Sequence, residues 1–470
     1  MVVMKFGGTS VGSAERIRDV ATIVRDASKT YQVVVVVSAM SGVTDLLVQA
    51  AEHAEQRAQK SFRDIVDTIR HKHIAAIESL KLDADTATSL RANVTKDLDE
   101  LSGWLEGVYM LRELTPRARD LITSFGERLS VQLVAASLVQ HGVAAEPVTA
   151  NRCIVTDDKF GDTQPDLKAS AKKTKRTLSP LLAELVTPVV TGFMGATTKG
   201  IVTTLGRGGS DYSATILGYC LDAHEVWIWT DVTGVMTADP RIIPKARTID
   251  HLSYDEAAEL SYFGAKVLHP FTMLPAALKQ TPIVIKNTLE PQAVGTHITE
   301  LATPDSHEVK AITSMKQLSL ITVQGKGMTG VPGFAARVFG ALAVAKVSVL
   351  FISQASSQYN ISLVVKRADG KHATDALHEE FRRDLSRHSI EMVKLRENLA
   401  IIAVVGEGMH GHPGVAGKTL SSLGESNINI VAIAQGSSER NISLVIDETD
   451  VPAAVRHIHD AFKLERDPKA

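Results

Sequence analysis

Short apolar runs alternate with helical periodicity over residues 1–300. The strand candidates are the five consecutive valines Val33–Val37 and the runs Pro188–Phe193, Ile201–Leu205, Glu225–Trp229 and Pro282–Lys286. Continuous apolar runs of this length are typical of strands that are covered on both faces, as in a parallel sheet. The helical stretches between them include Ser13–Ser28, Phe125–Gln140 and Asp211–Leu221. This order predicts a three-layer αβα domain with a mainly parallel sheet over residues 1–300.

Two segments interrupt this alternation. Residues 45–120 are charge-rich, have a helical pattern and contain no strand candidate, which predicts a helical insertion or cap on the sheet. Residues 296–308 are weakly periodic and contain a Thr-Pro-Asp-Ser turn at 303–306. We therefore place the end of the first domain near residue 300.

An internal repeat occupies the rest of the chain. Segment 325–365 recurs without a gap as segment 406–446, and the run Asn360–Val364 recurs as Asn441–Val445. Each copy has the pattern of a strand, a glycine-rich loop, a helix, two strands and a second helix. Two copies are too few for a solenoid, so we predict two ferredoxin-like βαββαβ modules. The two modules are assigned to residues 301–395 and 396–470.

The composition excludes several classes of protein. The chain has 470 residues, which at about 150 residues per domain predicts roughly three domains. Lys and Arg number 51 and Asp and Glu number 53, so the net charge of −2 provides no basic face for nucleic acid. Hydrophobic residues make up 44% of the chain, which excludes global disorder.

The cellular location is predicted from what the sequence lacks. Cys153 and Cys220 are too few for a disulfide scaffold, and no paired histidines have zinc-ligand spacing. No apolar run approaches the ~20 residues of a membrane span, and the start of the chain does not have the pattern of a signal peptide. We expect a cytoplasmic protein with no nucleic-acid or membrane partner and no protein-bound metal.

Two glycine-rich turns, each between a strand and a helix, are candidate anion sites. In the first, Lys5 precedes Gly7–Gly8, so that a lysine charge and backbone N–H groups can meet phosphate oxygens. In the second, Arg207 precedes Gly208, and its guanidinium can hold a carboxylate or phosphate through two hydrogen bonds. Each turn also has a structural interpretation, in which Lys5 is an exposed surface residue and Asp211 caps the next helix.

Further polar segments stand next to the predicted strands and helices. Ser38–Asp45 follows the valine strand and offers hydroxyl and N–H groups to a small polar ligand. Ser124–Arg128 opens a predicted helix, where Glu127 is either a favourable first-turn charge or a partner for a substrate ammonium. Thr230–Arg241 and Gly264–Pro270 are turn-rich, and taken alone they are ordinary surface loops.

Together these motifs resemble the aspartate kinases of the amino acid kinase superfamily, which usually carry C-terminal ACT-type regulatory domains. The motifs stand in family order and cover essentially the whole chain. They are Lys5–Gly12, Ser38–Asp45, Ser124–Arg128, Leu205–Tyr212, Thr230–Arg241, Gly264–Pro270 and both repeats. The resemblance implies transfer of the γ-phosphoryl group of ATP to the β-carboxylate of L-aspartate, the first step of lysine, threonine and methionine biosynthesis. It also implies that one ACT module is inserted within the other, with the segment after residue 300 completing the second module.

The resemblance assigns roles to single residues. Lys5 and Asp211 are implied to be catalytic, with Asp211 orienting the lysine. The implied L-aspartate ligands are Thr44, Glu127, Arg207 and Gly208. The implied nucleotide ligands are Lys5, Gly7, Gly8, Ser38, Thr230, Asp231, Met236, Arg241 and Lys266. Met236 departs from the family pattern, because many relatives have Tyr there. ATP is expected to bring Mg²⁺, which usually keeps water and phosphate ligands.

The repeats are predicted to bind a feedback inhibitor. A glycine-rich loop before a helix suits an amino-acid carboxylate, and a glutamine amide can pair with a hydroxyl. By resemblance to threonine-sensitive relatives, we expect L-threonine to bind near Met328, Gln354 and Gln435, with L-lysine as the second candidate. Leu350 stands where lysine-sensitive relatives can carry Asp. The alternative is that both glutamines only bridge the two modules.

Two other functions fit part of the same pattern: a superfamily enzyme with a different acceptor, and a non-catalytic amino-acid sensor. The paired repeats and the Ser124–Glu127 motif argue against the first. The intact Lys5, Arg207, Asp211 and Lys266 argue against the second. Small modules expose strand edges, so we expect a homodimer or homotetramer formed through the ACT modules. Because the chain stops soon after the second repeat, we expect no homoserine dehydrogenase domain.

Overall fold

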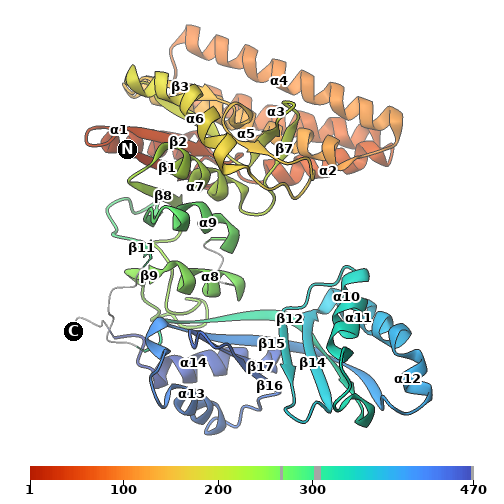
Figure 1. Ribbon diagram of the computed structural model, residues 1–470. Helices are drawn as coiled ribbons and strands as arrows, with labels where there is room; N and C mark the ends of the chain where they lie inside the picture. The colour runs from red at the N-terminus through yellow and green to blue at the C-terminus, as the bar shows by residue number, and fades with distance from the viewer. Residues whose placement is uncertain (265–267, 301–307, 467–470) are drawn as a thin grey trace. The chain divides into compact units, whose positions relative to one another are not determined.

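The computed structural model describes residues 1–264, 268–300 and 308–466, which form two compact units (Figure 1). The first unit comprises residues 1–235, 250–254 and 268–300. The second unit comprises residues 236–249, 255–264 and 308–466. Each unit has its own sheet and its own hydrophobic core, so each is described by itself.

An eight-stranded sheet forms the centre of the first unit. Its strands, in spatial order, are β3 (Ala145–Val148), β5 (Thr187–Thr191), β2 (Val33–Val37), β1 (Val2–Phe6), β8 (Glu225–Thr230), β10 (Ile283–Asn287), β11 (Thr296–Thr299) and β9 (His251–Ser253). Neighbouring strands are parallel except for β10 and β11. The predicted mainly parallel sheet is therefore confirmed, although residues 296–299, which were predicted to lie in a boundary loop, form strand β11.

A smaller sheet and the helices complete the first unit. The small sheet contains β4 (Val155–Thr156), β6 (Met194–Thr197) and β7 (Val202–Thr204). The helices that pack on the two faces of the large sheet are α1 (Ala14–Ser28) and α5 (Pro116–Gln140) on one side, and α6 (Leu167–Ala183) and α7 (Gly209–Leu221) on the other, with α9 (Pro270–Leu278) against α7. The predicted three-layer αβα arrangement is confirmed.

The alternation of side chains along β1 shows how the layers are specified. Val2, Met4 and Phe6 join the core beneath α1 and α5, whereas Lys5 points to the side of α7. The valines of β2 alternate in the same way, because Val33, Val35 and Val37 share that core. A single charged residue in a fully buried strand is therefore aimed at one defined face of the sheet.

The segment predicted as a helical insertion contains α2 (Val43–Glu55), α3 (Gln59–Ser79) and α4 (Ala84–Leu111), which pack against one another, and α2 and α4 also pack against α5. Leu98, Leu101 and Leu105 of α4 are completely buried at this packing surface. Apolar residues at this spacing form one face of a helix, which explains why a charge-rich segment still folds onto the domain.

One prediction in this region is wrong: Ser124–Arg128 does not open a helix. Helix α5 begins at Pro116, where the Thr115 hydroxyl accepts a hydrogen bond from the N–H of Ala118. A threonine cap followed by proline is a strong helix start, and it lies before the apolar stretch that led the prediction. Glu127 is therefore not a first-turn charge but a residue in the middle of a long helix.

The second unit contains a six-stranded sheet shared by the two repeats. The elements of the first module are β12 (Ala311–Gln324), α10 (Phe334–Val344), β13 (Phe351–Gln354), β14 (Asn360–Lys366), α11 (Arg367–Glu380) and α12 (Arg382–Ser386). Those of the second are β15 (Met392–Val405), α13 (Val415–Gly424), β16 (Ala432–Gln435), β17 (Asn441–Asp447) and α14 (Val451–Ala461). The spatial order is β13-β14-β12-β15-β17-β16, which confirms the predicted ferredoxin-like modules.

The two long strands belong to both modules. Residues 311–315 of β12 pair with residues 401–405 of β15, whereas residues 318–324 pair with β14 and with the first half of β15. The register shifts between these halves, and Gln317 and Asn398 have φ of 60° there. The start of β12 thus pairs with the half of β15 that also pairs with β17, and the insertion of the first module within the second stays a prediction.

Two segments that were assigned to the first domain pack instead in the second unit. Ala238 and Ile243 belong to the core of the second module, and Thr237 Oγ1 lies 3.1 Å from His459 Nε2. Glu256 and Lys310 form a buried ion pair with a 3.1 Å separation. Tertiary contacts thus cross the sequence boundary near residue 300, whose position stays a prediction.

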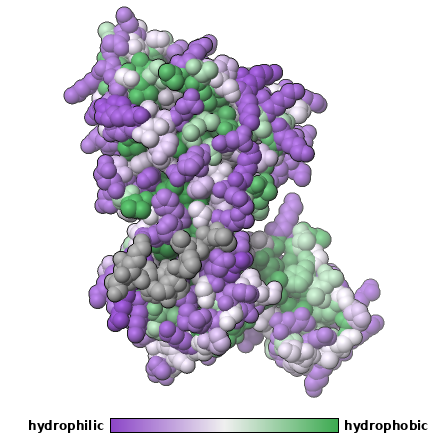
Figure 2. All heavy atoms as spheres, turned by 60° about the vertical axis from the view of Figure 1, so that its left-hand side comes forward, coloured by the Kyte–Doolittle hydropathy of each residue, from purple (hydrophilic) through white to green (hydrophobic). Residues whose placement is uncertain are grey.

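Hydrophilic residues predominate on the face that Figure 2 shows, with apolar patches between them. Exposed large apolar residues include Met110 and Leu111 at the end of α4. Within the described residues, no helix is both long enough and apolar enough to cross a membrane.

Candidate active site

A buried ion pair joins the two sides of the predicted catalytic site. Lys5 Nζ at the end of β1 lies 2.6 Å from Asp211 Oδ1 in the first turn of α7. Both side chains are more than four-fifths buried. A lysine held by a carboxylate in this way has a fixed position, so it can meet an anionic ligand without rearrangement.

The turn after Lys5 brings the backbone of two strands close together. The Gly7 N–H donates to the carbonyl of Trp229, and the Ser41 N–H donates to the carbonyl of Gly8. A Cβ atom added to Gly8 would lie 2.9 Å from the carbonyl oxygen of Ala39. Position 8 therefore requires glycine, because a side chain would push the loops after β1 and β2 apart.

Glu127 of α5 lies against the loop after β2. Its Oε1 accepts a hydrogen bond of 3.1 Å from the N–H of Ala39, and its buried Oε2 has no hydrogen-bond partner among the described residues. Burial raises the pKa of Glu127 to about 8, although the Ala39 N–H and the charge of Lys5 act in the opposite direction. A dry carboxyl group with one free oxygen is suited to receive a cation such as an ammonium group.

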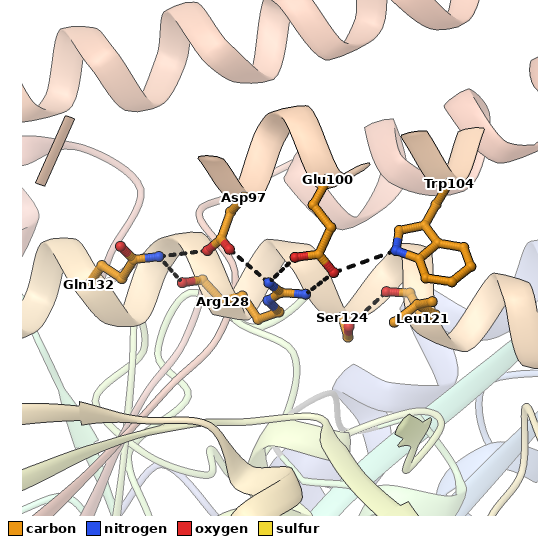
Figure 3. Close-up of polar contacts among 7 residues, drawn as sticks. All are labelled: Asp97, Glu100, Trp104, Leu121, Ser124, Arg128 and Gln132. Carbon is orange, nitrogen blue, oxygen red and sulfur yellow. Dashed lines mark hydrogen bonds and ion pairs between the residues drawn. The ribbon is translucent and has the colours of Figure 1, made fainter. Parts of the chain in front are cut away.

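Gly126 allows α5 to approach this loop. A Cβ atom at Gly126 would lie only 2.7 Å from the Cβ of Ala39. On the other side of Glu127, Arg128 joins α5 to Asp97 and Glu100 of α4 (Figure 3). The two shortest contacts of its guanidinium are 2.7 Å to Asp97 and 2.8 Å to Glu100. The position of Glu127 is thus fixed by neighbours on both sides.

The second glycine turn begins α7 at Gly208. Gly206 and Gly208 have φ of 70° and 68°, which favours glycine at both positions. Between them, Arg207 is exposed and makes no hydrogen bond or ion pair within the described part of the chain. Its guanidinium is therefore available to a ligand. Asp211 does not cap this helix, because the cap residue is Gly208.

Asp120 of α5 supports this turn and was not among the predicted site residues. Its carboxylate accepts hydrogen bonds from the N–H and hydroxyl of Thr204, at 3.1 and 2.6 Å, and from the N–H of Gly161 at 3.1 Å. Burial raises the pKa of Asp120 against the effect of these hydrogen bonds. Asp120 and Glu127 are seven residues apart and share one face of the helix, but the hydrogen-bond partners of Asp120 are distant in the sequence, so no local motif indicates its role.

A hydroxyl chain lies beside the first turn and was also missed. The Thr230 carbonyl accepts hydrogen bonds from the N–H and hydroxyl of Thr288, and that hydroxyl lies 2.7 Å from Ser10 Oγ. The Thr230 hydroxyl donates to Asp231 at 3.2 Å. The predicted nucleotide ligands Thr230 and Asp231 therefore lie at the end of β8, next to the end of β1.

The remaining predicted residues fall into three groups. Thr44 in the first turn of α2 and Ser38 after β2 are half-buried in the first unit. Met236 and Arg241 belong to the second unit, where Arg241 is paired with Asp239. Lys266 lies outside the described residues.

The predicted effector residues lie in the two repeat modules. Met328 and Gln354 line a cavity of about 330 Å³ in the first module, together with the glycine loop and Gln358. Gln435 has the corresponding place on β16 of the second module. Within the described residues, no group of three or more His, Cys, Asp or Glu side chains is arranged to hold a metal.

Comparison with known proteins agrees with this architecture. The model of the amino acid kinase family matches residues 1–287, and the ACT domain model matches residues 321–381 and 402–462. Aspartokinase 1 of Arabidopsis thaliana, a chloroplastic protein, is 34% identical over 98% of this chain and 80% of its own length. The chain belongs to the aspartokinase family. The resemblance inferred from the sequence motifs is thereby confirmed.

Other aspartokinases show how far the similarity extends. A bifunctional aspartokinase/homoserine dehydrogenase of Arabidopsis thaliana is 37% identical over 99% of this chain, and the chain spans about half of that relative's length. Crystal structures of E. coli aspartokinase III with aspartate and ADP, and with lysine and aspartate, have TM-scores of 0.82 and 0.79. They are 31% and 32% identical, and each alignment covers 98% of this chain and 99% of the other.

Proposed function

We propose that the protein transfers the γ-phosphoryl group of ATP to the β-carboxylate of L-aspartate, giving 4-phospho-L-aspartate. The observation that carries this proposal is the buried Lys5–Asp211 pair beside a glycine turn, with the half-satisfied carboxyl group of Glu127 close enough to interact with Lys5. An aspartokinase of E. coli was crystallised with aspartate and ADP, and this chain shares its fold over nearly the full length. In this role the enzyme would begin the biosynthesis of lysine, threonine and methionine.

The proposed roles follow from the charges of the two substrates. Lys5 and the N–H of Gly8 bind the phosphates, and Asp211 holds Lys5 in place. The predicted N–H of Gly7 already donates to the Trp229 carbonyl, so it would have to leave that bond to contribute. Glu127 receives the ammonium group of aspartate, whereas Arg207, with Thr44 and Gly208, holds a carboxylate. The β-carboxylate is already ionised at pH 7, so the transfer needs no general base. The barrier is repulsion between two anions, which fixed positive charges and amide dipoles reduce.

The nucleotide is proposed to extend from Lys5 towards Ser38, Thr230 and Asp231, with Met236, Arg241 and Lys266 as further contacts. Mg²⁺ usually keeps water and phosphate ligands, so the lack of a dense carboxylate cluster among the described side chains is no objection to an ion held mainly by the ATP phosphates. Bound there, Mg²⁺ would supply additional positive charge to the transferred group.

The acceptor is tested with a hydroxamate assay, in which hydroxylamine traps the acyl phosphate. Reactions contain ATP, Mg²⁺ and either L-aspartate, L-glutamate or a nucleoside monophosphate. We expect hydroxamate with aspartate alone. Product with glutamate, or phosphate transfer to the nucleotide, would indicate a superfamily enzyme with another acceptor, and no turnover with any acceptor would indicate a sensor.

We further propose that L-threonine inhibits the enzyme by binding in the first ACT module, with L-lysine as the second candidate. The cavity beside the glycine loop is lined by apolar groups and by the neutral amides of Gln354 and Gln358, which suit a hydroxyl better than a second ammonium. Lysine is present in one E. coli aspartokinase III structure. Separate titrations of threonine and lysine in the kinase assay distinguish the two effectors.

The exposed strand edges of the second unit also lead to a proposal for the oligomeric state of the protein. The sheet of the second unit ends in β13 and β16, and Ile352 and Ile433 on these strands are 49% and 42% exposed. Edge strands of this kind favour pairing, so we propose a homodimer or homotetramer formed through the ACT modules in the cytoplasm. Light scattering after size-exclusion chromatography measures the number of chains.

A further inference from the structure

The two ACT modules build the same glycine loop with nearly the same backbone. Each loop contains a short 3-10 turn, η2 (Lys326–Met328) in the first module and η3 (Glu407–Met409) in the second. Gly330 and Gly411 follow these turns with φ of 71° and 66°. Both loops therefore present the same backbone N–H groups in front of a helix, and any difference between them comes from side chains.

One loop N–H has a different partner in each module. The N–H of Gly330 donates to the amide oxygen Oε1 of Gln358 at 3.0 Å. The N–H of Gly411 donates to the carboxylate oxygen Oε2 of Glu439 at 2.7 Å. Gln358 and Glu439 occupy the same position of the repeat. Hydrogen bonds to a charged acceptor are shorter and roughly twice as strong as neutral ones. The loop N–H of the second module is therefore bound more strongly by its own side chain than that of the first module.

We propose that Glu439 is a built-in carboxylate ligand of the second module, so that only the first module binds the carboxylate of an amino-acid effector. This inference rests on the proposed regulation by an amino acid. In the first module an incoming carboxylate displaces a neutral amide, which leaves no charge unpaired. In the second module it must displace a carboxylate tethered to the same chain, and it meets a like charge at short range.

The side chains around the two loops also differ, and they too favour effector binding in the first module. In the second module, His410 Nδ1 lies 3.7 Å from Glu439 Oε2, and His412 Nε2 lies 3.0 Å from Glu308 Oε1. The corresponding residues of the first module are Thr329 and Val331, and Val331 lines the cavity. The second loop is thus surrounded by groups that already pair with each other, whereas the first borders a neutral cavity.

Calorimetric titration of the full chain tests the proposal by counting sites. With L-threonine, or with L-lysine if threonine does not bind, we expect one site per chain in the wild type. Glu439→Gln should raise this number to two, and Gln358→Glu should abolish binding. Both substitutions are nearly isosteric and lie at the surface, so the fold should be preserved. Glu425→Gln, which removes an exposed carboxylate after α13, is the matched control and should leave one site.

The results separate the failure of this inference from that of the proposed regulation. Two effector sites in the wild type, or one site in Glu439→Gln, would overturn the role of Glu439 while leaving regulation intact. If neither amino acid binds the wild type, the proposed regulation fails, and hydrogen exchange decides the inference. We then expect the amides of loop 406–414 to exchange several-fold more slowly than those of 325–333, and to lose that protection in Glu439→Gln. Equal exchange in both loops would overturn it.

Discussion

Both units of the molecule contain glycine turns between a strand and a helix, but different groups lie beside these turns. In the first unit, the glycine turn after β1 has a full positive charge beside it, because Lys5 is fixed there by Asp211. In the second unit, the N–H of Gly330 donates a hydrogen bond to Gln358 and the N–H of Gly411 donates one to Glu439. Neither of these two partners is a cation. If the proposed functions hold, the charge next to the turn, rather than the turn itself, separates a site for polyphosphate from a site for a single carboxylate.

Removing the charge from the first turn should have the largest effect. We expect Lys5→Ala to lower kcat by on the order of 10²–10³, because a preorganised positive charge at the transferred group is lost. Lys29→Ala, which removes a lysine that is 69% exposed, is the control and should leave kcat unchanged. Circular dichroism checks the fold. A folded Lys5→Ala enzyme with nearly normal kcat would contradict the assignment of this turn to phosphate.

Loss of the charges that are proposed to hold aspartate should produce the next largest effect. In Glu127→Ala and Arg207→Ala we expect the KM for aspartate to rise roughly tenfold to a hundredfold, which corresponds to about 1.5–3 kcal/mol for a hydrogen bond to a charged group. The KM for ATP should change much less. Steady-state kinetics with each substrate varied in turn provides the measurement. A selective rise in the KM for ATP would show that Glu127 and Arg207 belong to the nucleotide site rather than to the aspartate site.

The raised pKa of Glu127 makes aspartate binding depend on pH. At pH values below its pKa of about 8, Glu127 is mostly protonated when no aspartate is bound. An ammonium ligand, however, pairs with the ionised carboxylate of Glu127. Aspartate affinity should therefore rise as pH increases from 6 to 8. Calorimetry at a series of pH values should show this rise in the wild type. In Glu127→Gln the dependence should disappear; if it persists, another group is responsible.

Stability should change with pH in the opposite direction. The folded state binds the Glu127 proton more tightly than the unfolded state, whose carboxyl group has the ordinary pKa of 4.5. The stability contributed by this group is therefore complete below pH 4.5 and is lost as pH rises to about 8. Glu127→Gln cannot lose a proton, so its Tm relative to that of the wild type should increase across this range. A constant difference in Tm would argue against the buried, protonated carboxyl group.

The regulatory loops should give the smallest effects. Gln354→Ala should weaken threonine inhibition several-fold, because Gln354 lines the cavity of the first module. Gln435→Ala should change it less, since the corresponding loop is already closed by Glu439. Inhibition curves for both variants, without change in uninhibited kcat, measure the contrast. Equal weakening of threonine inhibition in both variants would contradict the distinction between the modules. Inhibition by lysine alone would show that lysine, not threonine, is the effector.

The sequence predicted the fold where pattern and chemistry are local. The valine run of β2 and the repeated loops in the second unit are defined by neighbouring residues, and both were predicted correctly. The start of α5 was predicted wrongly, because the Thr115 cap lies before the apolar stretch from which the helix was predicted. Likewise, the packing of residues 236–249 on the second module depends on contacts distant in sequence, such as that of Thr237 with His459.

The candidate site was predicted in part for the same reason. Lys5 and Asp211 stand next to glycine turns, so their motifs are visible, and the structure brings them together. Asp120 acts through hydrogen bonds to residues that lie 41 and 84 positions away, which no local motif displays. The pKa of Glu127 depends on the burial of α5 by other helices, so it could only be known once the chain was folded.

Transfer to a carboxylate oxygen is the central claim, and isotope labelling tests it most directly. The enzyme is given ATP, Mg²⁺ and L-aspartate labelled with ¹⁸O in its β-carboxylate, and hydroxylamine cleaves the acyl phosphate at carbon. The phosphate released then keeps the oxygen that bridged the two groups. We predict that ³¹P NMR shows one ¹⁸O atom in this phosphate. Unlabelled phosphate would mean that the protein only hydrolyses ATP and would contradict the account.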